Sequence, residues 1–226
     1  MKKGALKFLF LFLLASVIAL PVSGARAAPI NPSFEDEANP PLADDGWNPT
    51  ISGWNIAPGT SAGTWKPGVQ PTDGVQCVFI NDAGLIGQWT PDLLQADYTY
   101  TINVDVAART LGDSTVPAQF IVRLVASSDP GTAPDFILQE VSDVANRNSW
   151  STATLTYTVD PAYAGQIIGI QLGNLSSNWA YQIDFDNVRV TATDAAAVPE
   201  PATLLLPGFG LVGLASFGRK RVTVNG

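Results

Sequence analysis

Two aspartates, Asp184 and Asp186, are the residues of this sequence best placed for chemistry. Apolar side chains alternate with them up to Phe185, whereas Val188 and Val190 fall on the opposite parity. A one-residue β-bulge next to Asp186 would return all of these apolar side chains to one face of a strand. Such a bulge turns a carboxylate out of the regular ladder, and carboxylate oxygens are ligands that Ca²⁺ prefers. The pattern therefore predicts Asp186 as a calcium ligand.

The same aspartates have two other interpretations, as solvated carboxylates near a strand end or as the catalytic pair of a glycoside hydrolase. Asp184 and Asp186 share a face in a regular strand. A hydrolase needs its two carboxyl groups about 5–9.5 Å apart across a cleft, and spacing in the sequence does not establish this. We therefore expect a protein without catalytic residues, and keep a weak glycoside hydrolase that uses aspartates or glutamates as an alternative.

The chain has six tryptophans, many for a domain of this size, and the flat face of an indole is a surface on which the C–H face of a sugar stacks. Three lie beside apolar residues and are expected in the core, namely Trp54, Trp89 and Trp150. Three lie among polar, glycine or proline residues and are expected in exposed loops, namely Trp47, Trp65 and Trp179. We interpret these last three as candidate ligand-binding platforms, with lids over the ends of the fold as the alternative.

Charge and missing residue types exclude several function classes. The chain has no histidine and one cysteine, Cys77, which excludes a Ser-His-Asp triad, a Cys-His pair, histidine zinc sites and an internal disulfide. Cys77 lies in an apolar run and is expected to be a buried thiol. The net charge of −8 disfavours nucleic acids and anionic lipids, so neutral glycans or cations are the expected partners.

Alternating apolar and polar residues recur through the middle of the chain. From Tyr98 to Val106 every second residue is aromatic or β-branched, and the residues between them are Thr, Asn or Asp. The same rhythm returns around Val122, Leu155 and Ile170, with turn formers such as Asp160–Pro161 between the runs. These features predict an all-β fold, an antiparallel β-sandwich.

The order of several motifs resembles the galactose-binding-domain-like jelly rolls, a family that includes many carbohydrate-binding modules. The motifs are NPSFE from Asn31, YTYTINVDVAAR from Tyr98 and IDFDNVRV from Ile183. The resemblance covers nearly all of residues 30–192 and implies a jelly-roll sandwich with a structural Ca²⁺ between its first and last strands. It also implies that the calcium ligands are Glu35, Asp186 and a backbone carbonyl near Asn31.

Both ends of the chain have the composition of export signals. Residues 1–27 combine lysines, an apolar run and Ala25–Arg26–Ala27, the pattern of a signal peptide that signal peptidase removes. Residues 28–194 then form the sandwich domain, and residues 195–226 form a linker and a C-terminal signal. That signal joins a rigid tripeptide, an apolar segment and a basic end, in which the tripeptide is Pro199, Glu200 and Pro201 and the basic residues are Arg219, Lys220 and Arg221.

This C-terminal arrangement resembles the PEP-CTERM sorting signal of Gram-negative bacteria. Its apolar segment, residues 203–217, would span only about 22 Å as a helix, against roughly 30 Å of bilayer core. We therefore expect a transient transmembrane helix, with a simple membrane anchor as the alternative. The resemblance implies processing by an exosortase, a precursor held transiently in the inner membrane, and delivery to the cell envelope, the outer surface or the extracellular matrix.

The sequence thus predicts a non-catalytic envelope or biofilm-matrix protein that binds extracellular polysaccharide through a jelly-roll domain. A structural matrix or surface protein without a specific ligand is the first alternative, and the weak hydrolase is the second.

Overall fold

The computed structural model describes residues 28–36, 42–67, 70–110, 118–131, 133–177 and 181–194. Several predicted features lie outside these ranges, namely the signal peptide, Trp179, the tripeptide Pro199–Glu200–Pro201, the apolar segment and the basic residues Arg219, Lys220 and Arg221. Within the described ranges, no helix is long and apolar enough to cross a membrane.

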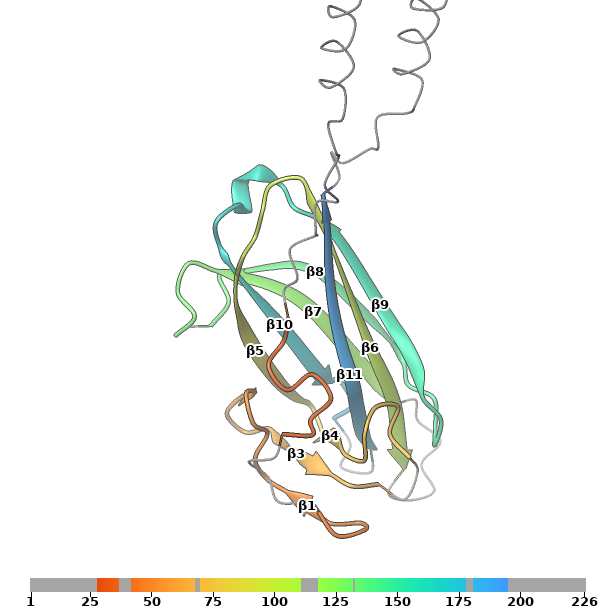
Figure 1. Ribbon diagram of the computed structural model, residues 1–226. Coiled ribbons are helices and arrows are strands. Elements are labelled where there is room, and N and C mark those ends of the chain that lie inside the picture. Colours follow the sequence, from red (N-terminus) through yellow and green to blue (C-terminus); the bar gives the residue numbers. More distant parts are fainter. Residues whose placement is uncertain are drawn as a thin grey trace, which may run out of the picture.

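The described chain forms two antiparallel sheets that pack face to face, as the alternating pattern predicts (Figure 1). In spatial order, sheet A consists of β1 (Trp47–Asn48), β3 (Ser61–Trp65), β4 (Cys77–Asn81), β11 (Tyr181–Asp194), β6 (Tyr98–Thr110) and β9 (Ser151–Thr158). Sheet B consists of β2 (Asn55–Ile56), β5 (Gly84–Leu93), β10 (Ile167–Asn174), β7 (Gln119–Ser127) and β8 (Phe136–Val144). One 3₁₀ turn, η1 (Pro161–Tyr163), is the only helical element of the described residues. The predicted β-sandwich is therefore confirmed.

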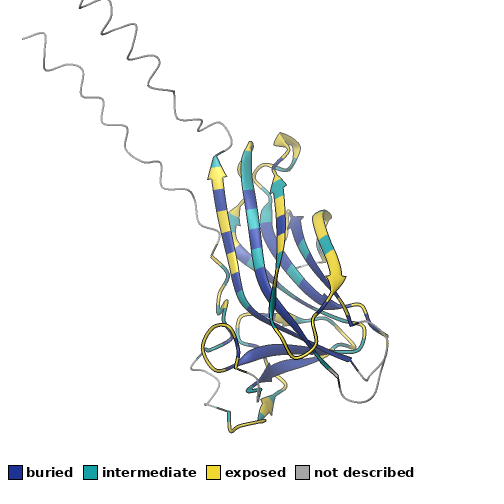
Figure 2. Ribbon diagram, turned by 90° about the vertical axis from the view of Figure 1, so that its right-hand side faces the viewer, coloured by how far each residue is buried: buried dark blue, intermediate teal, exposed yellow. Residues whose placement is uncertain are grey.

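The core lies between the sheets because side chains two residues apart in a strand share a face. Ile102 and Val104 of β6 and Phe185 of β11 are fully buried, and they pack with Leu124 of β7 and Ile168 of β10 from the other sheet. Figure 2 shows buried and exposed residues alternating along the strands. We call the face of each sheet that points away from the other its outer face.

The predicted bulge is present in β11. Asp186 pairs with Asp105 of β6, and the next pair is Arg189 with Asn103, so β11 has one more residue than β6 over this interval. Asn187 takes up the irregularity with a φ of 52°. The bulge keeps both Phe185 and the later valines of β11 in the core, as the parity argument requires.

Strand β11 lies in the middle of sheet A, between β4 and β6 (Figure 1). Tyr181, Ile183 and Phe185 point into the core, so the alternate side chains Gln182 and Asp184 lie on the outer face. The outer face of sheet A therefore carries polar groups at its centre, with strands on both sides that can wall them in.

Candidate ligand-binding site

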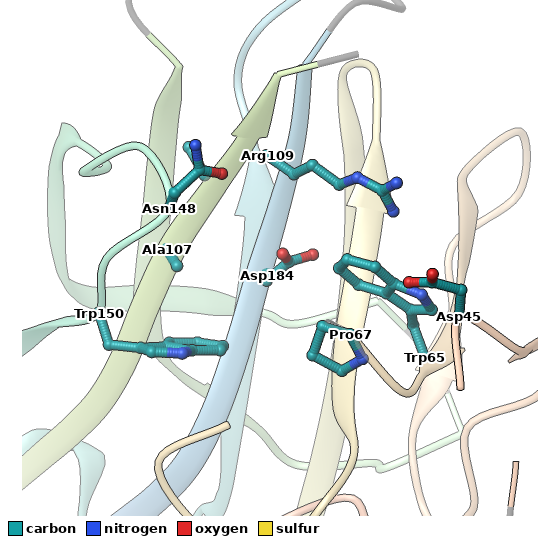
Figure 3. A pocket seen from close by; sticks show the side chains of 9 residues that line it. Asp45, Trp65, Pro67, Ala107, Arg109, Asn148, Trp150 and Asp184 are labelled. Carbon is teal, nitrogen blue, oxygen red and sulfur yellow. The ribbon is translucent and has the colours of Figure 1, made fainter. Parts of the chain in front are cut away.

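A pocket of about 220 Å³ opens on the outer face of sheet A, above Asp184. A neighbouring hollow of about 300 Å³ adjoins it, and the two share Asp45, Trp65 and Arg109 as lining residues. Trp150, which precedes β9, forms the opposite wall of the first pocket. Figure 3 shows Asp184 between the indoles of Trp150 and Trp65, with Arg109 reaching over Trp65.

Asp184 is only 5% exposed and has Ala107 of β6 and Phe79 of β4 as its cross-strand neighbours. Burial raises the pKa of Asp184 to about 7, while a hydrogen bond from Gln182 and the charge of Arg109 partly oppose this rise. Gln182 Nε2 donates that hydrogen bond to Asp184 Oδ1 over 2.6 Å. The base of the first pocket therefore has a buried carboxyl, and the adjoining hollow has a buried amide that is hydrogen-bonded to it.

The two indoles that line the pocket, Trp65 and Trp150, belong to a small apolar cluster on the outer face, separate from the main core. It consists of Trp65, Cys77 and Phe79, with Trp150 packed against it. Trp150 is fixed further by a hydrogen bond from its Nε1 to the carbonyl of Gln70, 3.0 Å long. Apolar side chains on the outer face of a sheet normally meet water, so this cluster gives the pocket a dry aromatic wall.

Arg109 and Trp65, which both line the pocket, are joined by cation–π stacking. The guanidinium carbon of Arg109 lies 4.3 Å from the centre of the Trp65 ring. Trp47 of β1 meets Phe79 edge-on, with 6.3 Å between the ring centres. The four groups thus form a continuous strip from the first pocket into the second.

The tryptophan predictions have mixed outcomes. Trp47 is 63% exposed, as expected, and lines the second hollow. Trp65 does not lie in an exposed loop: it belongs to β3 and is 7% exposed, because Arg109 and the apolar cluster cover it. Trp150, expected in the core, is half-buried in the pocket wall. Whether these indoles bind a ligand stays a prediction.

Three further expectations about packing can be compared with the structure. Trp54 is 6% exposed in the core and Cys77 is fully buried, and both agree with the sequence pattern. Burial also raises the pKa of the Cys77 thiol well above its ordinary value. Trp89, expected in the core, lies half-exposed in a groove on the other sheet.

The predicted calcium ligands Glu35 and Asp186 meet at one loop. Glu35 Oε1 accepts a hydrogen bond of 2.7 Å from the amide of Val75, and a second from the amide of Gln76. Asp186 Oδ2 accepts a hydrogen bond of 2.8 Å from the amide of Asp73 and another of 2.9 Å from the hydroxyl of Thr72. The two carboxylates therefore hold the segment 72–76 against β11 at its bulge.

Asp186 is fully buried, and burial raises its pKa to about 6 against the opposing hydrogen bonds of the loop. Asn31 lies in the same N-terminal turn as Glu35. Its backbone carbonyl accepts a hydrogen bond from the amide of Phe34, and its side-chain oxygen accepts one from the amide of Asp36. Within the described residues, no three Asp, Glu or Cys side chains gather in one metal-binding group. A cation at Glu35 and Asp186 would therefore need backbone oxygens to complete its shell, which Ca²⁺ accepts.

Sequence reasoning does not single out Gln182, Arg109 or Trp150 as site residues. Gln182 had an available signal, since it precedes Asp184 and Asp186 at two-residue spacing in the closing strand. Arg109 reaches the pocket from β6 and Trp150 from the residue before β9, so their role depends on the order of strands in sheet A.

Comparison with known protein families identifies two parts of the chain. Residues 27–191 match the HpiC1 cyclase family, and residues 197–221 match the PEP-CTERM protein-sorting motif. The sorting motif implies a secreted, envelope-associated protein of a Gram-negative bacterium that an exosortase processes. A comparison with curated proteins gives no match.

Solved structures similar to this chain include two cyclases from Fischerella. The apo form of a cyclase from Fischerella sp. has 20% identity and a TM-score of 0.62, and covers 77% of this chain and 99% of its own. The Stig cyclase Fisc from Fischerella sp. TAU, in complex with (3Z)-3-(1-methyl-2-pyrrolidinylidene)-3H-indole, has 20% identity and a TM-score of 0.59, covering 76% and 100%.

The tandem CBM22 domain of Paenibacillus barcinonensis Xyn10C has 14% identity and a TM-score of 0.50, covering 79% of this chain and 48% of its own. At these identities the likeness concerns the fold, and it confirms the predicted jelly-roll sandwich. Since the family match spans most of the sequence, the chain belongs to the HpiC1 cyclase-like family and carries a PEP-CTERM sorting motif.

Proposed function

We propose that this exported protein binds a neutral carbohydrate in the pocket on the outer face of sheet A and performs no chemistry on it. The observation that carries the proposal is the arrangement of Trp150 and Trp65 on two sides of Asp184, which accepts a hydrogen bond from Gln182 of the adjoining hollow. An indole offers its flat face to the apolar C–H face of a sugar ring, while an amide and a carboxyl take hydroxyl groups.

The charges around the pocket favour an uncharged ligand. Arg109 is stacked on Trp65 and lies near Asp184, which leaves it poorly placed to bind an added anion. Asp45 and Asp184 both line the pocket and would repel acidic sugars. Neutral extracellular polysaccharides are therefore the class of ligand that fits both the aromatic walls and the carboxyl at the base of the pocket.

A structural Ca²⁺ is the second part of the proposal. Glu35 and Asp186 would hold it together with backbone oxygens near Asn31 and the segment 72–76. The support is chemical: Asp186 is a buried carboxylate with a raised pKa and no cationic side chain paired with it in the described residues. Bound calcium would supply that missing positive charge and tie the N-terminal turn to β11.

The place of action follows from the sorting motif. We propose that a precursor rests transiently in the inner membrane through residues 203–217, that an exosortase processes it near Glu200, and that the product reaches the outer surface or the extracellular matrix. There, binding to polysaccharide would make it a matrix or adhesion component.

Isothermal titration of the exported protein with xylohexaose, cellohexaose and galactotriose tests the binding function. We expect binding of at least one of them, weakened on the order of tenfold or more by Trp150→Ala. The matched control is Trp54→Phe, a core change that leaves the pocket lining intact. Absence of binding in the presence and absence of Ca²⁺ would favour the alternative of a structural matrix protein without a specific ligand.

A second candidate function is proton-donating catalysis by Asp184. The family match is to a cyclase, the solved Stig cyclase is in complex with an indole compound, and Asp184 lies at the base of a pocket with aromatic walls. In such a reaction the Asp184 proton would pass to a substrate carbon, the resulting cation would close a ring, and a proton lost from the ring would return to Asp184. A weak hydrolase would need a second carboxylate, for which Asp45 is the available group.

Asp184→Asn distinguishes these functions, because Asn keeps the shape and the acceptor of the side chain but has no proton of this kind to give. Retained saccharide binding with no turnover in either protein supports the binding function. Turnover of an indole substrate or a polysaccharide that disappears in the variant supports catalysis.

A further inference from the structure

A second groove, of about 740 Å³, lies on the outer face of sheet B. Its floor is formed by β5, β10 and β7, one wall by residues 55–58, and the other by the loop that contains Pro130 and Pro134. The groove lies on the opposite side of the sandwich from Asp184, because the two sheets turn their outer faces away from each other (Figure 1). It therefore shares no lining residue with the first pocket.

Along the floor of the groove, each large side chain lies opposite a glycine of the neighbouring strand. Trp89 pairs with Gly169, Gly87 with Gln171, and Leu85 with Gly173 across the β5–β10 ladder. A Cβ atom at position 169 would lie 2.6 Å from the indole carbons Cε3 and Cζ3, so the Trp89 ring occupies the space above that glycine. The indole consequently lies against Gly169 of the neighbouring strand, and it lines the groove.

No ionisable side chain lines the groove among the described residues, although the whole chain has a net charge of −8. Its polar side chains are amides, Asn55, Gln88 and Gln171. Gln88 is already engaged, since its amide contacts the backbone of Ile30 and Gly53. Asn55 and Gln171 are therefore the side chains left to bind a ligand, and the groove has no charge with which to bind an ionic one.

The wall opposite residues 55–58 is held in place by hydrogen bonds. Asp135 Oδ2 accepts from the hydroxyls of Ser127 and Ser128, at 3.1 Å each, and from the amide of Ser128 at 2.9 Å. Asp129 Oδ1 accepts from the amide of Gly131 at 2.9 Å. Pro130 and Pro134, which line the groove with Trp89, thus lie next to residues that these hydrogen bonds hold in place.

We propose that this groove is a second carbohydrate-binding site, which takes a neutral saccharide stacked on Trp89 with its hydroxyls bound by Gln171 and Asn55. A groove of this volume matches the usual size of a small-ligand site, about 300–1,000 Å³. The proposal does not depend on the first pocket, because its residues and its sheet are different. With both sites occupied, one molecule links two polysaccharide chains from opposite sides, which raises avidity without any new contact.

The test is the stoichiometry of binding of xylohexaose, cellohexaose and galactotriose, measured by isothermal titration with the wild type, Trp89→Ala, Gln171→Ala and Trp150→Ala. We expect Trp89→Ala to remove one binding site, and Gln171→Ala to weaken that site about tenfold. Leu93→Ala is the matched control, since Leu93 is exposed on β5 but lies outside the groove lining. Thermal unfolding of each variant confirms that it is folded.

The outcomes separate this proposal from the proposed function. Two sites in the wild type, with one lost in Trp89→Ala and the other in Trp150→Ala, support both. A single site abolished by Trp89→Ala and unaffected by Trp150→Ala supports the groove and refutes the first pocket. Binding that is identical in wild type and Trp89→Ala overturns the groove as a saccharide site, as does self-association of the protein that only Trp89→Ala abolishes.

Discussion

Gln182 Nε2 and Asp184 Oδ1 are joined by a hydrogen bond of 2.6 Å on the outer face of β11, where both side chains are more than nine-tenths buried. A buried carboxyl is easier to keep neutral than charged, so burial raises the pKa of Asp184 to about 7 from an ordinary value of 3.8. Between these two pH values the folded protein holds a proton that the unfolded chain has released. The folded state is therefore favoured at lower pH and loses this advantage as the pH rises toward 7.

Asp184→Asn should flatten the dependence of stability on pH. The wild type should lose thermal stability between about pH 4 and pH 7, and the variant should lose less, by about a few degrees in melting temperature, because it has no carboxyl to ionise at this position. Thermal unfolding in buffers that contain EDTA measures this without a contribution from bound metal. Parallel curves for the two proteins would contradict the assignment of the raised pKa to Asp184.

Ca²⁺ should raise the melting temperature of the protein, because a ligand that binds only the folded state stabilises it by mass action. At a hundredfold excess over the dissociation constant the gain should be on the order of 5–10 °C. Asp186→Asn and Glu35→Gln should abolish the response, whereas Asp143→Asn, an exposed acid on β8, should preserve it. A calcium response that persists in Asp186→Asn would place the metal elsewhere.

Gly63→Ala should loosen β1 from sheet A. A Cβ atom at position 63 would lie 2.1 Å from the carbonyl oxygen of Asn48, so β1, which carries Trp47, has to move away. We expect a loss of about 1–3 kcal/mol in the free energy of unfolding and faster hydrogen exchange at the amides that pair β1 with β3. Ser61→Ala, two residues earlier on the same strand, is the control, and an equal effect of both changes would refute the steric argument.

Glu200→Ala in the sorting motif should leave unprocessed precursor in the membrane fraction, because the motif is the feature that an exosortase recognises. Immunoblots of membrane and culture fractions measure the ratio of precursor to mature protein. Thr203→Ala, just beyond the tripeptide, serves as the control for a nearby change. Normal amounts of mature protein from Glu200→Ala would show that the tripeptide does not direct processing.

The strands and the bulge are predictable from the sequence because they depend on local parity. Val188 and Val190 reveal the bulge since their parity conflicts with that of Phe185, whatever the neighbouring strands are. The calcium pair could be proposed from a resemblance of motifs at the two ends of the domain. The structure adds that Glu35 and Asp186 grip the same loop, which neither motif contains.

The solvent exposure of each tryptophan could not be predicted in the same way. Exposure of an indole depends on the face of the sheet that it occupies and on what lies opposite. Trp65 is covered by Arg109 from β6, two strands beyond its own neighbour β4, and Trp89 lies over a glycine from β10. These contacts join residues about 40 or more positions apart, and only the order of strands brings them together.

The central place of β11 also determines when sheet A can form. Strands β4 and β6 both find their ladder partner in β11, which is the last strand of the described chain, so sheet A stays split until that strand has emerged. The two halves of sheet A, β1–β3–β4 and β6–β9, can join only through that last strand.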